Sequence, residues 1–92
     1  MKTLHLNLKR KWFDMIKSGE KMEEYREMKP YWHDRLFKGF DTITFSNGYA
    51  KDRDQFVIKL LSIHQSTGLM EWGAERGVTY LVLRLGEIVD GS

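Results

Sequence analysis

The sequence contains no cysteine, and this absence excludes several classes of protein at once. Without cysteine there is no disulfide framework, no thiolate zinc site and no cysteine nucleophile. Proline is nearly absent as well, with one residue in 92, whereas aromatic residues make up 13% of the chain, and together these argue against disorder. The chain is therefore expected to fold as a small globular protein.

Long apolar runs are also missing. No stretch approaches the roughly 20 apolar residues that span a bilayer, and the N-terminal segment Met1–His5 lacks the long apolar core of a signal peptide. We therefore expect a cytoplasmic protein with no membrane partner. A length of 92 residues predicts one domain, covering residues 1–92, because so short a chain has no room for a second core.

Motifs for metal binding and nucleophilic catalysis are missing too. The three histidines, His5, His33 and His64, lack the spacing of metal ligands, and the chain has no glycine-rich phosphate loop or nucleophile elbow. Ser18 and Ser46 have no histidine nearby in sequence, so a Ser/His/Asp triad has no support. We expect neither a metal ion nor a cofactor.

Charge is distributed unevenly along the chain. The net charge is +2, but residues 1–40 hold ten Lys/Arg and six Asp/Glu, whereas residues 41–92 hold five and seven. The basic half suits a polyanion such as nucleic acid. A solvated surface of mixed charge explains the same distribution equally well.

Apolar periodicity predicts five strands and two helices. A period of two indicates strands, and a period near 3.6 ending at a glycine indicates helices. The expected strands span residues 3–8, 21–27, 41–45, 55–65 and 78–88, and the expected helices span residues 9–18 and 31–38. The apolar phase of the fourth strand changes near Leu60, which predicts a bulge there. One helical turn is expected at residues 70–72.

The order of these elements indicates the fold class. Both short helices fall in the N-terminal half of the chain, so the elements do not form a βαβ series. The fifth strand is apolar on both sides and is expected to be central. We predict an α+β fold in which five to six strands curl into a small β-barrel and the helices close one opening.

The most polar stretch between well-patterned elements is Gly19–Pro30, which carries four glutamates and three Lys/Arg around one tyrosine. A strand is favoured here, although glutamate and lysine also suit a helix. Alternation along a strand would place Lys21, Glu23 and Tyr25 on one face, and Met22, Glu24 and Arg26 on the other. Either face would bring a charged pair inward, which marks a functional site or a structural ion pair.

Several short motifs resemble the ASCH domain family, which belongs to the PUA-like superfamily of small β-barrels. The resemblance runs over nearly the whole chain and rests on Leu6, Leu8, Lys9, Trp12, Phe13, Gly19, Lys21, Glu24, Tyr25, Arg26, Trp32, Phe45, Asn47, Gly48 and Tyr49. Its strongest part is the string Gly19-x-Lys21-x-x-Glu24-Tyr25-Arg26. The resemblance implies a barrel with a helix between its first two strands, and a cleft lined by Lys21, Glu24 and Arg26.

The resemblance also implies a class of ligand. The family is considered to bind RNA or to handle modified nucleobases, and some relatives are thought to cleave RNA. Others remove the acetyl group of acetylated cytidine with a lysine at the position of Lys21, a threonine three residues later and a glutamate after the long fourth strand. Here Glu24 stands in place of that threonine, and the distal glutamate is either Glu71 or Glu75.

Our first hypothesis is therefore a module that binds RNA or a nucleoside in the cleft beside the second strand. Phosphates would meet the basic start of the first helix, and a base would stack on one of two tryptophans. The candidate ligand-binding residues are Lys9, Lys21, Glu24, Arg26, Trp32, Asn47, Tyr49 and Trp72.

The alternative hypothesis is a small hydrolase that cleaves RNA or acts as an acetylcytidine-type amidohydrolase. Lys21 would be its central group, with Glu24 or Tyr25 as the acid/base partner. A third hypothesis is an adaptor in which the charged strand is only a lattice of ion pairs. The sequence leaves the natural ligand and the oligomeric state open.

Overall fold

The computed structural model describes residues 2–36 and 38–91. Within these residues the chain forms five strands, two α-helices and one 3-10 helix, in the order β1 (Thr3–Leu8), α1 (Arg10–Lys17), β2 (Glu23–Glu27), α2 (Pro30–Leu36), β3 (Thr42–Asn47), β4 (Gln55–Thr67), η1 (Met70–Trp72) and β5 (Thr79–Asp90). The predicted α+β class is therefore confirmed, and the predicted elements are present with ends shifted by a few residues.

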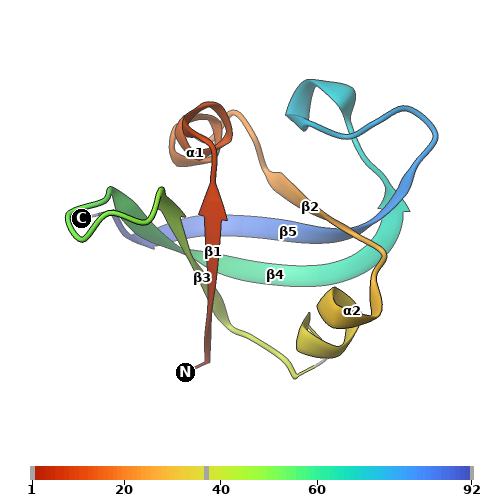
Figure 1. Cartoon of the computed structure of the whole chain (residues 1–92), viewed down its shortest axis with the longest axis horizontal. Coiled ribbons are helices and arrows are strands. Elements are labelled where there is room, and N and C mark those ends of the chain that lie inside the picture. Colours follow the sequence, from red (N-terminus) through yellow and green to blue (C-terminus); the bar gives the residue numbers. More distant parts are fainter. Residues whose placement is uncertain (1, 37, 92) are drawn as a thin grey trace.

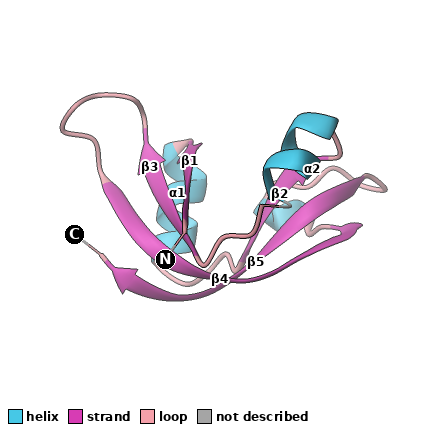
Figure 2. Cartoon of the chain, turned by 90° about the horizontal axis from the view of Figure 1, so that it is seen from below, coloured by secondary structure: helices cyan, strands magenta, loops and turns pink. Residues whose placement is uncertain are grey.

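The five strands form one sheet in the order β1-β3-β4-β5-β2. β1 pairs with β3 in parallel, and the other neighbouring strands are antiparallel. The sheet curls into a half-barrel, so the predicted barrel is only partly formed: β1 and β2 are its two edges, and in the described part of the chain they do not pair with each other. Figure 2 shows the resulting trough, with β4 and β5 at its base.

β4 carries the irregularity that the phase change near Leu60 predicts. Its pairing with β5 shifts register three times between Val57 and Ser62. Such irregular pairing bends a strand and increases its twist. The long β4–β5 pair therefore curves along the whole base of the trough (Figures 1 and 2). β5 lies between β4 and β2, so it is an interior strand, while β4 occupies the middle of the sheet.

The core lies against the alternating apolar face of β1. Leu4, Leu6 and Leu8 are all buried, as their period of two predicts. Helix α1 adds Phe13 and Ile16 to this core, and the Phe13 ring meets the Phe56 ring edge-on at 5.0 Å between centroids. The two helices lie at opposite ends of β2, so they bracket the charged strand (Figure 1).

The second strand is shorter than the predicted residues 21–27, because β2 begins at Glu23. The backbone N–H of Lys21 donates to the Met15 carbonyl oxygen at 2.9 Å, which ties this residue to the end of α1 instead of to the sheet. Lys21 therefore lies outside the strand, and strand alternation does not set the direction of its side chain. Its ammonium group contacts the Glu24 carboxylate, although alternation along a strand would place the two side chains on opposite faces.

Candidate functional site

Lys21, Glu24 and Arg26 form a continuous chain of ion pairs. Lys21 Nζ lies 3.0 Å from Glu24 Oε1, and Arg26 Nη2 lies 2.7 Å from Glu24 Oε2. Lys21 is 3% exposed and Glu24 6%, so both charges are almost fully removed from water. The Arg26 side chain is 20% exposed and forms the accessible end of the chain. The cluster carries two cations and one carboxylate, and its net charge is therefore +1.

Aromatic rings cover both cations of this cluster. Lys21 Nζ lies 4.5 Å from the centroid of the Trp12 ring and 5.7 Å from that of Tyr25. The Arg26 guanidinium lies 5.0 Å from the centroid of the Trp32 ring. Contacts between a desolvated cation and a ring face contribute about 2 kcal/mol. These rings therefore offset part of the cost of burying Lys21. Trp12 is half-buried beside the core, not enclosed in it.

Burial lowers the pKa of Lys21 from its ordinary value, because a charged ammonium is poorly solvated there. The negative charge of Glu24 and its hydrogen bond oppose this shift, whereas the positive charge of Arg26 adds to it. A lysine with a lowered pKa binds its proton less tightly in the folded than in the unfolded chain. Its contribution to stability therefore increases as the pH rises toward about 10.4, the ordinary lysine value.

Tyr25 ties β2 to the turn that follows β4. Its hydroxyl donates to Glu23 Oε1 at 2.9 Å and accepts from the Leu69 backbone N–H at 3.0 Å. Burial raises the pKa of Tyr25 to about 12, with Glu23 adding to the shift and the hydrogen bond from Leu69 opposing it. The hydroxyl is thus held in its neutral form as a structural link between the two segments.

The hydrogen-bonded Tyr25 hydroxyl predicts that part of the free energy of unfolding is lost at alkaline pH. The pKa of Tyr25 rises from about 10 in the unfolded chain to about 12 in the folded one. The folded state therefore holds the proton more tightly, and the free energy of unfolding falls as the pH rises through this window. In the variant Tyr25→Phe this part of the decline is expected to vanish, which urea unfolding at several alkaline pH values measures.

The matched control for this experiment is Tyr49→Phe, because Tyr49 is 89% exposed. Its stability is expected to follow wild type at every pH. At neutral pH, Tyr25→Phe is expected to cost about 1 kcal/mol for its lost hydrogen bonds. An alkaline decline as steep in Tyr25→Phe as in wild type would show that the hydroxyl does not hold its proton as described.

A groove of about 430 Å³ opens beside Arg26, with contributions from both edges of the half-barrel. Its walls come from β1, β2, α2 and the end of β3 with the loop that follows it. The lining residues are His5, Leu6, Asn7, Arg26, Tyr31, Trp32, Arg35, Ser46, Tyr49 and Arg53. Three arginines and three large aromatic residues are among them, and no lining residue is acidic. The groove is therefore positively charged and has aromatic walls.

Asn7 holds two walls of this groove together. Its side-chain amide donates to the Gly48 carbonyl at 2.7 Å and accepts from the Gly48 backbone N–H at 2.9 Å. The backbone carbonyl oxygen of Asn7 lies 3.5 Å from Arg26 Nη2, across the gap between β1 and β2. Asn47 donates to the Leu8 carbonyl at 3.0 Å. Both asparagines thus fix the turn that carries Tyr49.

The structure brings some of the predicted ligand-binding residues together and separates others. Arg26, Trp32 and Tyr49 line the groove. Lys21 and Glu24 lie behind Arg26 and do not line it. Tyr25 is turned toward the segment after β4, where its hydroxyl bonds Leu69.

Three other predicted residues lie outside the groove. Asn47 acts as a brace for the turn, and Trp72 belongs to η1. Lys9 is exposed next to α1, where Arg10 already pairs with Asp14 at 3.3 Å and Asp54 at 2.9 Å. The basic start of the helix is therefore partly neutralised by carboxylates of the chain itself, and the phosphate contact predicted there stays a prediction.

Several residues that line the groove were not predicted from the sequence to bind a ligand. Arg35 and Tyr31 lie one turn apart on α2, and the Arg35 guanidinium donates to the Tyr31 hydroxyl at 3.1 Å. Arg53 belongs to the polar loop after β3, where its charge gave the only signal. Asn7 and His5 belong to an alternating strand whose polar face could equally have faced solvent. Only the gap between β1 and β2 brings these residues to one place.

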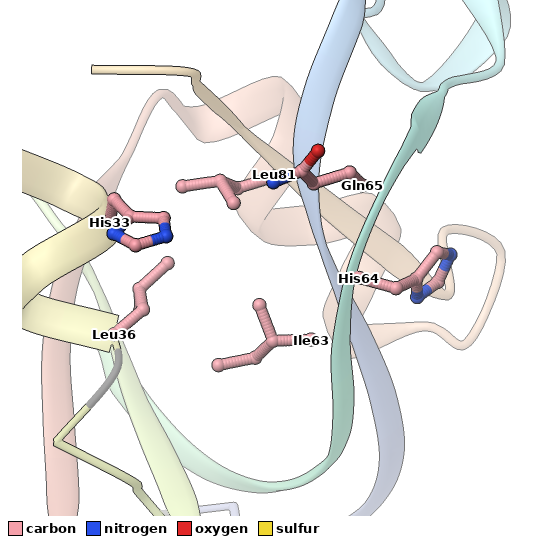
Figure 3. Close-up of a pocket in the computed structure, with 6 residues that line it drawn as sticks. All are labelled: His33, Leu36, Ile63, His64, Gln65 and Leu81. Atoms are coloured by element: carbon pink, nitrogen blue, oxygen red, sulfur yellow. The ribbon is translucent and has the colours of Figure 1, made fainter. Parts of the chain in front are cut away.

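A second cavity of about 310 Å³ lies on another side of α2 and is mostly apolar. Figure 3 shows His33 and Leu36 of α2 opposite Ile63 of β4 and Leu81 of β5, with the His64 side chain pointing away on the other side of β4. This cavity lies on the side of α2 that Leu36 anchors to the core. It offers apolar surface and no cluster of charges.

Neither a membrane span nor a metal site is found in the described part of the chain. No helix there has the length and apolar character to cross a bilayer. Likewise, residues 2–36 and 38–91 contain no group of three or more histidine, aspartate or glutamate side chains placed to hold a metal ion.

No protein-family model matches the chain, and no curated protein matches it. The geometry of the groove and of the ion-pair chain behind it is therefore the basis for a functional argument.

Proposed function

We propose that this chain is a PUA-like, ASCH-type binding module for RNA or a modified nucleobase. The observation that carries the proposal is the groove itself: three arginines and three aromatic rings with no acidic residue among the lining side chains. Proteins that bind single-stranded nucleic acid combine positive charge for the backbone with aromatic faces for the bases. The resemblance of the Gly19–Arg26 string to the ASCH family supports the same class of ligand.

Trp32 is the residue on which a base would stack. Its ring lines the groove and is held by the Arg26 guanidinium at 5.0 Å and by the Tyr31 ring at 5.1 Å between centroids. A ring held by its neighbours loses little freedom on binding, so its contact area converts efficiently into affinity. Glu24 and Lys21 serve the site indirectly, because Glu24 fixes the position of Arg26.

The proposal predicts that Trp32→Ala weakens binding of a short single-stranded RNA about tenfold, within the range known for one stacked base. The measurement is fluorescence anisotropy of a labelled oligonucleotide of about six nucleotides at several salt concentrations. Arg53→Ala is expected to weaken binding and to reduce the slope of log affinity against log salt by about 1, because it removes one phosphate contact.

Matched control variants lie outside the groove. Trp72→Ala removes a tryptophan from η1, and Arg76→Ala removes an exposed arginine. Both are expected to bind RNA within about twofold of wild type and with the wild-type salt slope, since neither touches the groove. No saturable binding by wild type would refute the proposed function, and equal losses in Trp72→Ala and Trp32→Ala would refute the groove as its site.

A second candidate function is a small hydrolase centred on Lys21, acting on RNA or on an acetylcytidine-type substrate. One observation favours it: burial lowers the pKa of Lys21, as a nucleophilic or basic lysine requires. Against it, Lys21 lies under Trp12 with its ammonium bound to Glu24, and neither residue lines the groove. Product analysis after incubating wild type and Lys21→Met with RNA and with acetylcytidine decides between the two: the binding proposal expects no product from either protein.

A further inference from the structure

Two arginines that line the groove each carry a buried hydrogen-bond donor that the described chain does not satisfy. Among the described residues, two buried side-chain atoms lack a hydrogen-bond partner, Nε of Arg26 and Nε of Arg35. Both arginines line the groove. Leaving a buried donor without an acceptor costs free energy, and native structures rarely retain one without a reason. Two such donors on arginines of one groove show that these guanidinium groups are incompletely paired within the described chain.

The positive charges of the groove arginines are also incompletely balanced by carboxylates. Arg35 donates to the Tyr31 hydroxyl at 3.1 Å, and Arg53 donates to the Ala50 carbonyl at 3.2 Å, both of them neutral acceptors. No carboxylate of residues 2–36 and 38–91 forms an ion pair with Arg35 or Arg53. Arg26 shares its one carboxylate, Glu24, with a second cation.

These features fit a phosphate group better than a neutral base or sugar. A phosphomonoester carries about 1.5–2 negative charges at neutral pH and three strong acceptor oxygens. The planar guanidinium fork matches phosphate oxygens in pairs. A neutral nucleoside would leave the charges of Arg35 and Arg53 uncompensated. A groove of about 430 Å³ falls within the range of roughly 300–1,000 Å³ that is usual for small-ligand sites.

We propose that the groove recognises a phosphomonoester attached to a nucleoside, with the phosphate held by the arginines and the base against Trp32. This inference rests on the proposed function and narrows its ligand. The phosphate belongs either to a free nucleoside monophosphate or to the phosphorylated end of an RNA chain. Both sources present the same chemical group to Arg26, Arg35 and Arg53.

Isothermal titration calorimetry tests the inference with defined probes. Wild type is titrated with cytidine, with its 5′- and 3′-monophosphates, with inorganic phosphate, and with an RNA trinucleotide that carries or lacks a terminal phosphate. One of the two monophosphates is expected to bind about 30-fold more tightly than cytidine, as one to two charge-assisted hydrogen bonds imply. Inorganic phosphate alone is expected to bind more weakly than that monophosphate.

Variants connect this preference to the groove. Arg35→Ala is expected to reduce the monophosphate preference to about threefold or less while changing cytidine affinity by less than about twofold. Arg53→Ala is a second variant with the same expectation, in case the first does not fold, which thermal melting shows. Arg76→Ala removes an exposed arginine outside the groove and is expected to keep the full preference.

The possible outcomes separate this inference from the function on which it rests. Equal affinity for cytidine and both monophosphates, or a preference unchanged in Arg35→Ala and Arg53→Ala, overturns the inference. If RNA also binds in a Trp32-dependent manner, the proposed function stands without it. If no probe binds, both fail. A phosphorylated trinucleotide that binds at least as tightly as the mononucleotide supports an RNA end as the source, and weaker binding supports a free nucleotide.

Discussion

Replacing Glu24 with alanine is expected to lower the free energy of unfolding by about 3–5 kcal/mol, the range for removing one partner of a buried ion pair. Glu24 accepts from Lys21 at 3.0 Å and from Arg26 at 2.7 Å. Without the carboxylate, Lys21 would remain almost fully buried with a second cation nearby and no counter-charge. Denaturant unfolding with linear extrapolation measures the loss.

Glu24→Gln separates the lost charge from the cavity that alanine leaves. It keeps the volume and one acceptor oxygen, and it is expected to retain most of the destabilisation because the charge is the larger contribution. Adding Lys21→Met to Glu24→Gln is expected to recover part of the loss, since the unpaired buried cation is then gone. A double variant no more stable than Glu24→Gln would contradict this explanation.

The control for this series is Glu27→Ala. Glu27 is 68% exposed and pairs with Lys29 at 3.1 Å on the surface, so its removal is expected to change stability by less than about 0.5 kcal/mol. If Glu24→Ala costs no more than this control, then Glu24 does not hold the cations in the way the geometry indicates.

Gly68→Ala is expected to cost about 2–3 kcal/mol, the upper part of the range for overpacking. A Cβ at Gly68 would lie 2.6 Å from Cζ of the Tyr25 ring and 2.8 Å from Cβ of Ala74. The ring cannot easily move away, because its hydroxyl is bonded to Glu23 and to the Leu69 backbone. Thermal and urea unfolding measure the effect.

Gly91→Ala is the matched control, because the nearest atom to a Cβ there is 3.9 Å away, an ordinary contact. It is expected to leave stability within about 0.5 kcal/mol of wild type. The cost of Gly68→Ala is expected to shrink when Tyr25 is replaced by alanine, because the clashing ring is then absent. An undiminished cost in the Tyr25→Ala background would place the strain elsewhere.

Local pattern alone determined most of the elements of this fold. Strand β1 follows from the alternation of Leu4, Leu6 and Leu8, and the irregularity in β4 follows from its change of apolar phase near Leu60. Gly19 and Gly39 take left-handed backbone angles just after the two helices, at the positions where the sequence predicted an end. These signals are readable because a strand face and a helix end depend on residues only a few positions apart.

The candidate site was predictable only in part. Arg26, Trp32 and Tyr49 were predicted to bind ligand, and the structure brings them to one groove. Whether Glu24 met a ligand or an ion-pair partner stayed open in the sequence, because both faces of the expected strand carried carboxylates. In the structure Glu24 forms ion pairs with both Lys21 and Arg26 and does not line the groove, so any role in binding stays a proposal.

What only the tertiary structure decided is the groove itself. Arg35 and Arg53 carry no sequence signal that separates them from solvated surface arginines. They line the same groove as Arg26 because the sheet curls and leaves a gap between β1 and β2, which are separated in sheet order by three other strands. Strand pairing and curvature depend on contacts between residues distant in sequence, such as the 3.5 Å approach of Arg26 to the Asn7 carbonyl. Local periodicity contains no record of such contacts, and the charge, shape and aromatic walls of the site therefore arise only in the folded chain.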